Sequence, residues 1–498
     1  MTVTTLSETE RATRLVDRAR RAQEAWGEAT PKERAQALRT LPDLVLARLD
    51  EIVTVIHEEN GKPRVEASAH EAAPAVALAR HHVDKAPKVL GASRIRTPNL
   101  PHRKVVRHHR PYGVVVAIAP WNFPFLIPFS QVLPALLAGN AVVLKPSELT
   151  PRVARLLVEI VHQTGIDPDL LQLAEGDGAT GAALVDAHPD KVLFTGSVAT
   201  GRRVMAAAAQ FPVPVGLELG GIDALVVLED ADLDFAAEAA SWGATFNGGQ
   251  ACCSVERLIV ARSIHDELVE KIRATMAEIP LADLGPAIDG RQLSTWGRHI
   301  EEAQSIGAQV SCGGHPLPGD RFAPTLVTDP HVLEASVWSD ETFGPVVAAV
   351  PFDSEAEAVA LHNDTRYGLT ASVLSADTRR AAALAGRLNA GAVAVNEVAA
   401  ILYSSPEVPW GGVGDSGFGR SHGVDALLDA SWVQVIDTPR GVRFGPHRPW
   451  WHPYDPALED GMAALAAAYA TRNPGRRTTA LIRAGRRLLP LTRRGGSR

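Results

Sequence analysis

The chain has 498 residues, of which 46% are hydrophobic and 21% charged, the composition of an ordinary globular protein. This length exceeds what one hydrophobic core usually serves, so we expect two or three domains. The formal net charge is -7. Nine arginines lie between residues 472 and 498, which leaves about -16 for the rest of the chain. An acidic body argues against nucleic acid as the main partner.

The three cysteines, Cys252, Cys253 and Cys312, are too few for a disulfide framework and lack C-x-x-C spacing. This fits a reducing compartment, and we find no cluster of histidine and cysteine that indicates a metal site. The N-terminus is charged from residue 8 onward and lacks the apolar core of a signal peptide. No stretch approaches the roughly 18 apolar residues of a membrane span. We therefore expect a cytoplasmic protein without a metal.

Residues from about 8 to 90 have apolar positions at three- and four-residue spacing, which predicts helices. From residue 103 onward short apolar runs alternate with helical stretches. Strands are predicted at 114–118, 141–144, 170–174, 192–194 and 213–219, with helices near 150–164, 178–187 and 200–209. Strands separated by helices in this way predict a parallel sheet with helices on both faces.

The pattern restarts near residue 223 with a strand at 224–228 and a helix from about 232. A second α/β unit is predicted to continue to about 425, with a domain boundary near 220. A late strand at 432–436 needs a partner within the chain or on a neighbouring subunit. Beyond 440 the frequent Pro, His and Trp residues predict an irregular connector.

The basic C-terminal segment contains a candidate helix at 479–491. We expect its apolar and basic side chains on different faces: Leu481, Ala484, Leu488 and Leu489 on one, and Arg483, Arg486 and Arg487 on another. Basic amphipathic helices can lie on anionic membranes, so weak membrane contact is one hypothesis. A solvated end is the alternative, because Gly475, Gly485 and Pro490 weaken a helix.

Two sequence patterns are weak evidence for function when taken alone. G-x-G-x-x-G occurs at 176–181 and at 412–417. The first lies between a strand and a helix, but no acidic residue follows at the offset that holds a ribose. We therefore expect it not to contact phosphate. The tetrapeptide Gly414-Asp415-Ser416-Gly417 imitates a serine-protease nucleophile loop, yet an α/β chain offers no such frame, and we predict a turn.

Two segments carry reactive groups. In Phe246-Asn247-Gly248-Gly249-Gln250-Ala251-Cys252-Cys253, a glycine-containing turn delivers two thiols just before a strand. A cysteine there can attack a carbonyl as a thiolate, although a small buried cysteine is the equal alternative. In Glu218-Leu219-Gly220-Gly221, a carboxylate between apolar neighbours is costly to bury unless it is used or paired. A raised pKa would suit it as a base for water. A surface glutamate is the other interpretation.

Two further segments follow predicted strands of the first sheet. Pro120-Trp121-Asn122-Phe123-Pro124 holds an amide that could donate a hydrogen bond to an oxyanion, although an Asx turn gives the same sequence. Lys145-Pro146-Ser147-Glu148 places a Lys and a Glu where a ribose could bind, or where they form a solvated pair. Ligands bind at the carboxyl ends of parallel strands in open α/β sheets.

These segments, together with Phe194-Thr195-Gly196-Ser197, Glu341-Thr342-Phe343-Gly344-Pro345 and Pro409-Trp410-Gly411-Gly412, resemble the aldehyde dehydrogenase superfamily. The resemblance covers about residues 10–440, and E-L-G-G at 218–221 followed by G-Q-A-C at 249–252 is highly specific. It implies an α/β fold with a Rossmann-type cofactor domain at 1–95 and 112–220 and a catalytic domain at 221–425. A bridging and oligomerisation element would comprise 96–111 and 426–440, and 441–498 would be a C-terminal extension.

The resemblance implies oxidation of a small-molecule aldehyde to the acid with NAD(P). Cys252 matches the nucleophile that forms a thiohemiacetal and then a thioester. Asn122 matches the amide that stabilises the oxyanion, and Glu218 the base that activates water for hydrolysis. Cys253 is then structural.

The remaining site residues follow the same resemblance. The cofactor would contact the loop with Pro120 and Trp121, the ribose ligands Lys145, Ser147 and Glu148, the helix start at Gly196 and Ser197, and the nicotinamide-side pair Glu341 and Phe343. Phe123, Phe246 and Trp410 would form the substrate tunnel, with Trp121 at its wall. Glu148 would repel a 2′-phosphate and Lys145 accept one, so we expect NAD, with NADP as the alternative. The strand 432–436 would join a neighbouring subunit in a homodimer or homotetramer.

The sequence departs from the family pattern at three places. Ile222 and Gly414 stand where relatives often have lysine, and Ser130-Gln131 stands where many have Trp-Lys. None removes a catalytic group, but tunnel shape and charge differ, so the aldehyde is not identified. Three rivals stay open: a CoA-acylating dehydrogenase, a non-catalytic relative, and a hydrolase that uses Cys252 alone. Glu218 argues against the first, because CoA release needs no water-activating base.

Overall fold

The computed structural model describes residues 7–98, 100, 103–328, 330–440, 452 and 454–493. The chain forms two compact units: Met1–Gly91 with His109–Gln434, and Ala92–His108 with Val435–Arg498. The connector predicted just beyond residue 440 lies outside the described residues. The domain boundaries stay a prediction, and the sheets are described here one by one.

The first sheet has six strands in the order β17-β7-β6-β3-β4-β5. Their bounds are β3 (Val114–Ile118), β4 (Ala141–Lys145), β5 (Leu171–Leu173), β6 (Lys191–Thr195), β7 (Val215–Glu218) and β17 (Gly417–Phe418). All neighbours pair in parallel except β17, which is antiparallel to β7. β3 and β4 are buried throughout, as apolar runs covered on both faces must be. The predicted parallel sheet is confirmed.

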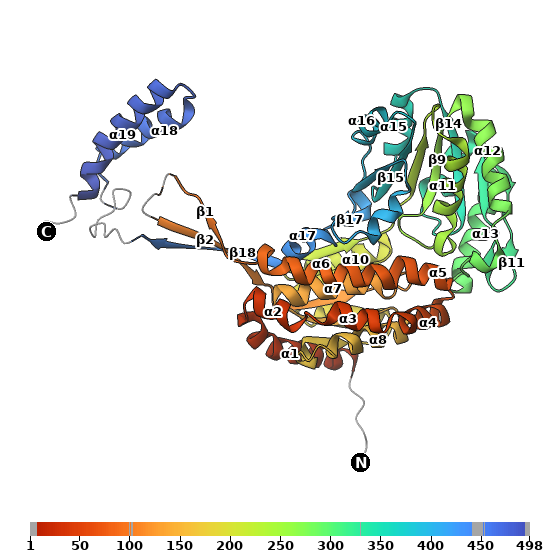
Figure 1. The fold of residues 1–498 in the computed structure, drawn as a ribbon, viewed down its shortest axis with the longest axis horizontal. Helices are drawn as coiled ribbons and strands as arrows, with labels where there is room; N and C mark the ends of the chain where they lie inside the picture. The colour runs from red at the N-terminus through yellow and green to blue at the C-terminus, as the bar shows by residue number, and fades with distance from the viewer. Residues whose placement is uncertain are drawn as a thin grey trace, which may run out of the picture. The chain divides into compact units, whose positions relative to one another are not determined.

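Helices link these strands and cover both faces of the sheet (Figure 1). They are α7 (Leu126–Ala138), α8 (Pro151–His162), α9 (Gly178–Asp186) and α10 (Val198–Ala208). Right-handed crossovers put α7 and α8 on one face and α9 and α10 on the other. The N-terminal helices add to these layers: α1 (Glu8–Glu28) packs on α9, and α2 (Pro31–Ala37), α3 (Leu41–Ala47), α4 (Leu49–Asn60), α5 (Arg64–Ala67), η1 (Ser68–Ala72) and α6 (Ala73–Val89) lie on the α7–α8 side.

The second sheet has seven strands in the order β10-β13-β14-β9-β8-β15-β16. Their bounds are β8 (Asp223–Val227), β9 (Val255–Ala261), β10 (Gln309–Cys312), β13 (Thr325–Thr328), β14 (Val346–Phe352), β15 (Thr370–Leu374) and β16 (Ala392–Val395). Its helices are α11 (Leu233–Thr245), α12 (Arg262–Ala277), α13 (Gly290–Ser305), α14 (Ser336–Ser339), α15 (Glu355–Asn363) and α16 (Thr378–Ala385). Only β10 runs antiparallel to its neighbour.

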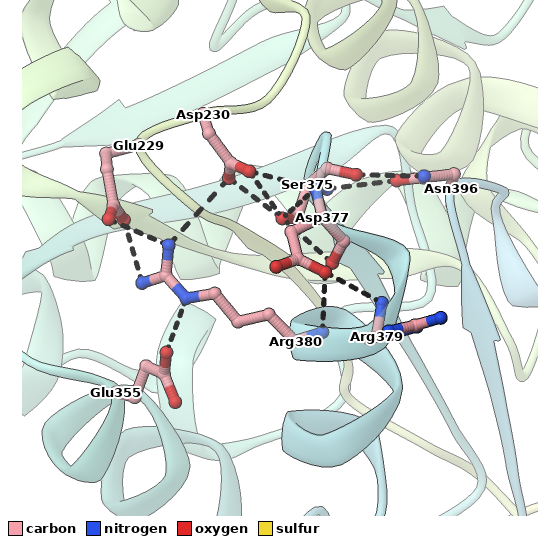
Figure 2. Close-up of polar contacts among 8 residues, drawn as sticks. All are labelled: Glu229, Asp230, Glu355, Ser375, Asp377, Arg379, Arg380 and Asn396. Atoms are coloured by element: carbon pink, nitrogen blue, oxygen red, sulfur yellow. Dashed lines mark hydrogen bonds and ion pairs between the residues drawn. The ribbon is translucent and has the colours of Figure 1, made fainter.

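A polar network closes the carboxyl ends of β8, β15 and β16 (Figure 2). The guanidinium of Arg380 on α16 pairs with Glu229 at 2.8 Å and with Glu355 at 2.6 Å. The Ser375 hydroxyl donates to Asp230 at 2.8 Å, and the Asn396 amide donates to the Ser375 carbonyl at 2.9 Å. Ion pairs and side-chain hydrogen bonds therefore stabilise the carboxyl ends of these three strands.

The remaining elements lie around the two sheets. α17 (Gly423–Asp429) packs on α6 and α7, and β11 (Pro316–Leu317) pairs with β12 (Arg321–Phe322). β1 (Ser93–Ile95), β2 (Arg103–Pro111) and β18 (Ser431–Pro439) form a three-stranded sheet with β18 at one edge. The predicted late strand is thus confirmed. In the second unit, α18 (Ala457–Ala470) and α19 (Pro474–Arg493) form a helical hairpin.

Candidate active site

The thiol loop lies directly before β9. Asn247, Gly248 and Gly249 all have positive φ angles, 53°, 63° and 70°. A Cβ added at Gly249 would lie 2.0 Å from the Gly344 backbone, so only glycine fits there. The Gln250 side chain donates to the Pro286 carbonyl at 2.8 Å and accepts the Ile288 N–H at 2.9 Å. Backbone shape and this clamp together fix the position of Cys252.

Asn122 follows β3 and reaches the same loop. Its amide nitrogen donates to the Gln250 carbonyl at 3.1 Å, while its buried Oδ1 has no hydrogen-bond partner. One N–H of the amide group therefore anchors the thiol loop and the second is left for another acceptor. Asn122 and Cys252 border one cavity, so the two segments, far apart in sequence, meet as predicted.

A buried ion pair that the sequence analysis missed supports the Asn122 loop. Lys62 and Glu71 pair with side chains 1% and 0% exposed. Lys62 Nζ also donates to the Asn122 carbonyl at 2.8 Å, and Glu71 accepts the Phe125 N–H at 2.8 Å. No local sequence signal could have found this pair, because its function depends on a loop some sixty residues away.

Glu218 ends β7, and the paired glycines after it pack against the thiol loop. A Cβ added at Gly221 would lie 2.5 Å from the Cys252 carbonyl oxygen, which leaves no room for a side chain. Burial raises the pKa of Glu218 to about 7, as the sequence analysis expected in direction. The hydrogen bond that the protonated Cys252 thiol donates to Cys253, followed by burial, raises the pKa of this thiol well above its usual value.

Cys252 and Glu218 both border a small apolar cavity. The aromatic and imidazole side chains that line it are His70, Phe123, Trp242, Phe246, Tyr403 and Trp410. The three residues predicted for the tunnel, Phe123, Phe246 and Trp410, are among them. Trp121 is not; it lies in the neighbouring cleft, with its ring 5.6 Å from that of Phe343. Its predicted place at the wall of the substrate tunnel stays a prediction.

A second cleft, which shares Pro120 and Trp121 with the cleft next to Cys252, lies along the carboxyl ends of β3, β4 and β6. The predicted cofactor residues that line it are Pro120, Trp121, Lys145, Ser147, Glu148, Gly196 and Ser197. Lys145 Nζ lies 3.3 Å from Glu148, and Ser197 caps α10 by accepting the Thr200 N–H at 3.4 Å. A helix N-terminus beside the Lys145–Glu148 pair fits a dinucleotide, because its free N–H groups attract pyrophosphate.

The glycine motif at 176–181 also borders this cleft, through Gly178 and Gly181. The expectation that it does not contact phosphate stays a prediction. The other glycine motif forms a turn, η7 (Gly414–Ser416), as predicted. The Ser416 hydroxyl donates to the Gly220 carbonyl at 2.7 Å and so helps to hold the Glu218 segment.

Glu341 and Phe343 border the cleft next to Cys252. The Gly221 N–H donates to Glu341 at 3.3 Å, and burial raises the pKa of Glu341 to about 8. Phe343 has a positive φ of 52°, which is strained for an aromatic residue. Glu256 of β9, also missed from the sequence, accepts the N–H groups of Thr342 and Phe343, both at 2.8 Å, and holds this segment.

The site is therefore lined by loops and strand ends of both sheets. The first sheet contributes residues that follow its strands, and the second contributes residues that precede β9 and β14. Three cavities meet there, and Glu218 and Cys252 border both the apolar cavity and the cleft. Among the described residues no group of three or more His, Cys, Asp and Glu could hold a metal. None of the described helices is long and apolar enough to span a membrane.

Comparison with known proteins decides the family, because the model for the aldehyde dehydrogenase family matches residues 1–436. The chain belongs to the aldehyde dehydrogenase family. It is 40% identical over 88% of its length to a 4,4′-diapolycopene aldehyde oxidase of a Methylomonas species, covering 83% of that relative. It is 38% identical over 86% of its length to a betaine aldehyde dehydrogenase of Cereibacter sphaeroides, covering 89% of that relative.

Solved structures agree. An NAD-dependent aldehyde dehydrogenase from Sinorhizobium meliloti is 32% identical, with a TM-score of 0.84 and 89% of each chain covered. Betaine aldehyde dehydrogenase from Staphylococcus aureus in complex with NAD+ is 29% identical, with a TM-score of 0.83, covering 89% of this chain and 90% of that one. The predicted fold is confirmed, and the protein is an NAD(P)-dependent aldehyde dehydrogenase.

Proposed function

We propose that Cys252, Asn122 and Glu218 carry out the oxidation. The Cys252 thiol loses its proton to water, and the sulfur forms a bond to the aldehyde carbon while the carbonyl π bond opens to an oxyanion. The free N–H of Asn122 stabilises the negative charge on the former carbonyl oxygen. NAD(P) held in the cleft would supply the hydride acceptor, and loss of hydride from the carbon would re-form the carbonyl as a thioester on Cys252. The single observation that supports this most is that Cys252 and Glu218 border both cavities.

Glu218 completes the reaction in this proposal. A carboxylate with a pKa of about 7 takes a proton from water at neutral pH, and the water oxygen attacks the thioester carbon. The carbon–sulfur bond breaks, the acid leaves, and Cys252 regains a proton. Because the thiol pKa is raised, Cys252 is protonated at rest, and in this proposal Glu218 acts on the water of the second step only.

The cleft residues fit NAD(P) in the roles that the sequence predicts. Lys145 and Glu148 would hold the adenosine ribose, Ser147 would border it, and the start of α10 at Gly196 and Ser197 would face the pyrophosphate. Glu341 would hold the nicotinamide ribose. Phe343, Trp121 and Pro120 would pack against the cofactor. We propose NAD as the preferred form, because the Glu148 carboxylate repels a 2′-phosphate, although Lys145 and Arg203 border the same cleft.

We propose that the substrate is an apolar, uncharged aldehyde. The cavity beside Cys252 is lined by aromatic and aliphatic side chains, and no Lys or Arg is among its described lining residues. His70 stays neutral there, because burial lowers its pKa to about 4. A carboxylate such as that of succinate semialdehyde would find no cationic partner. The aromatic walls leave a quaternary ammonium aldehyde as the second candidate, because such cations bind ring faces.

A substrate panel assayed with NAD and with NADP tests this proposal. We expect kcat/KM for decanal or benzaldehyde to exceed that for succinate semialdehyde by at least tenfold, with acid released without CoA. Betaine aldehyde as the best substrate would favour the second candidate. A Cys252→Ala variant that still reduces NAD would contradict the proposed nucleophile, and dependence on CoA would favour an acylating enzyme.

Three wider proposals accompany this function. We propose a homodimer or homotetramer that forms through the exposed edge of β18. A cytoplasmic location would keep the three free cysteines reduced, as the proposed nucleophile requires. Weak contact of the basic C-terminal segment with a membrane is the third proposal. The helical hairpin indicates which side chains would make this contact.

A further inference from the structure

The helical hairpin of α18 and α19 lies beyond residue 436, where the family model ends. Its seam consists of small residues: Gly461, Ala464, Ala468 and Ala484 are buried between the helices. A Cβ added at Gly461 would lie 2.4 Å from the Leu488 side chain, so the helices approach closely. Ala484 and Leu488 therefore face α18. The sequence analysis expected Ala484 and Leu488 on one apolar face with Leu481 and Leu489, and the structure divides this set between a packed face and an exposed one.

The apolar side chains that α19 leaves exposed are different ones. Leu481, Ile482 and Leu489 are 44%, 52% and 60% exposed. At 100° per residue these three positions lie within one third of the helix circumference, next to the face that packs on α18. Met462 and Tyr469 of α18 are also half exposed. Large apolar side chains gathered in this way on a small unit usually mark a contact surface.

Arginines occupy the third face of α19. In helical projection Arg476, Arg483 and Arg486 follow the exposed apolar strip on the side away from α18, whereas Arg487 lies beside Gly461 of α18. Among the described residues of the hairpin, only Arg487 forms an ion pair, with Asp460 at 3.8 Å, and both partners are more than half exposed. An unneutralised basic strip beside an exposed apolar strip is complementary to a surface that is anionic outside and apolar beneath.

We infer that α19 lies flat on an anionic lipid membrane, with Leu481, Ile482 and Leu489 inserted among the acyl chains and the arginines at the headgroups. A phosphate backbone of nucleic acid would match the arginines but would offer nothing to the apolar strip. A lipid surface matches both strips. The helix is too rich in arginine to cross the bilayer, in agreement with the absence of a spanning helix among the described residues.

Sedimentation of the full-length protein with vesicles tests this inference. We expect it to pellet with vesicles of three parts phosphatidylcholine to one part phosphatidylglycerol, and at least tenfold more weakly with phosphatidylcholine alone. Leu481→Ser with Ile482→Ser should weaken anionic binding at least tenfold. A matched control, Leu46→Ser with Val65→Ser, changes two exposed apolar residues in the first unit and should bind as the wild type does.

The basic strip has its own test. Arg483→Gln with Arg486→Gln should also reduce anionic binding at least tenfold, and raised salt should weaken the wild type. Aldehyde oxidation without vesicles should be unchanged in every variant, so failure of this inference is separable from failure of the proposed function. Wild-type binding by the apolar double variant would overturn the inference, and so would equal binding to neutral vesicles. A loss of self-association in place of vesicle binding, or tighter binding to duplex DNA, would also overturn it.

Discussion

Glu218 borders both the apolar cavity and the cleft next to Cys252, and burial raises its pKa to about 7. A carboxylate of this kind is ionised to a useful extent at neutral pH and is still basic enough to take a proton from water. Its carboxylate form is the active one, so thioester hydrolysis should rise as the pH increases through about 7 and then level off.

Glu218→Gln should separate the two halves of the reaction. The thioester should still form on Cys252, so a burst of NADH close to one per active site is expected in a stopped-flow experiment. Steady-state turnover should fall by about 100-fold or more, because the base for water is gone. The pH inflection near 7 should disappear from what remains. Loss of both burst and turnover would show that Glu218 also takes the proton from Cys252.

Lys62 illustrates a buried charge that acts through another residue. Removing one partner of a buried ion pair leaves the other charge without compensation, and it also frees the Asn122 carbonyl from Lys62. We expect Lys62→Met to lower the free energy of unfolding by about 3–5 kcal/mol in urea denaturation. It should also lower kcat/KM, since the Asn122 loop loses its support.

A double variant is the control for this pair. In Lys62→Met with Glu71→Gln, the second side chain is neutral but its oxygen still accepts the Phe125 N–H. Stability should recover in part while kcat/KM stays low. Full stability in the single variant would show that the pair is not buried as described.

At the scale of elements, the strands could be predicted and the charged supports could not. The valine runs at 114–118 and 141–144 predict buried strands because strands covered on both faces need apolar side chains at every position. For Cys252 and Glu218 the residues alone left a buried thiol and a surface carboxylate open, and the resemblance to the aldehyde dehydrogenase superfamily supplied their roles. Glu256 and Lys62 look like ordinary surface charges in sequence. Their burial depends on backbone N–H and carbonyl groups that are distant in the chain.

The orientation of α19 was unpredictable for a related reason. Its sequence allows apolar side chains on two adjacent faces, and only the position of α18 decides which one is covered. Small residues in α18, Gly461 above all, select Leu488 and Ala484 as the packed pair. The sequence of one helix alone does not indicate which of its faces packs on a second helix.

The amino and carboxyl ends of the strands in the second sheet have different roles, and this difference allows a test. Cys252 and Glu341 lie at the amino ends of these strands and belong to the site, while the Arg380 network lies at the carboxyl ends (Figure 2). Arg380 is 32% exposed, so its ion pairs are partly screened by water. We expect Arg380→Met to lower the free energy of unfolding by about 1 kcal/mol, with kcat and KM unchanged. A change in KM would mean that the two ends of the strands are coupled.

For the whole molecule, β18 has apolar side chains that nothing in the described chain covers fully. Trp432, Val433, Val435 and Ile436 are 43%, 50%, 54% and 38% exposed. Consecutive side chains of a strand point to opposite faces, so both faces of this edge strand are apolar. Exposed apolar edge strands pair with other chains unless they are protected. A second subunit is the simplest cover, and it would extend the sheet across a two-fold axis.

Charges placed on one face of β18 should prevent this assembly. Val433→Asp with Val435→Asp would bring like charges of two subunits together and would bury them without partners. Light scattering after size exclusion should give two or four chain masses for the wild type and a single chain mass for the variant. Val65→Asp, a valine-to-aspartate change at a position 67% exposed on α5, should leave the mass unchanged. Since Glu218 and Cys252 lie within one chain, the separated subunit should still form the thioester, and a dead but folded monomer would show that assembly completes the site.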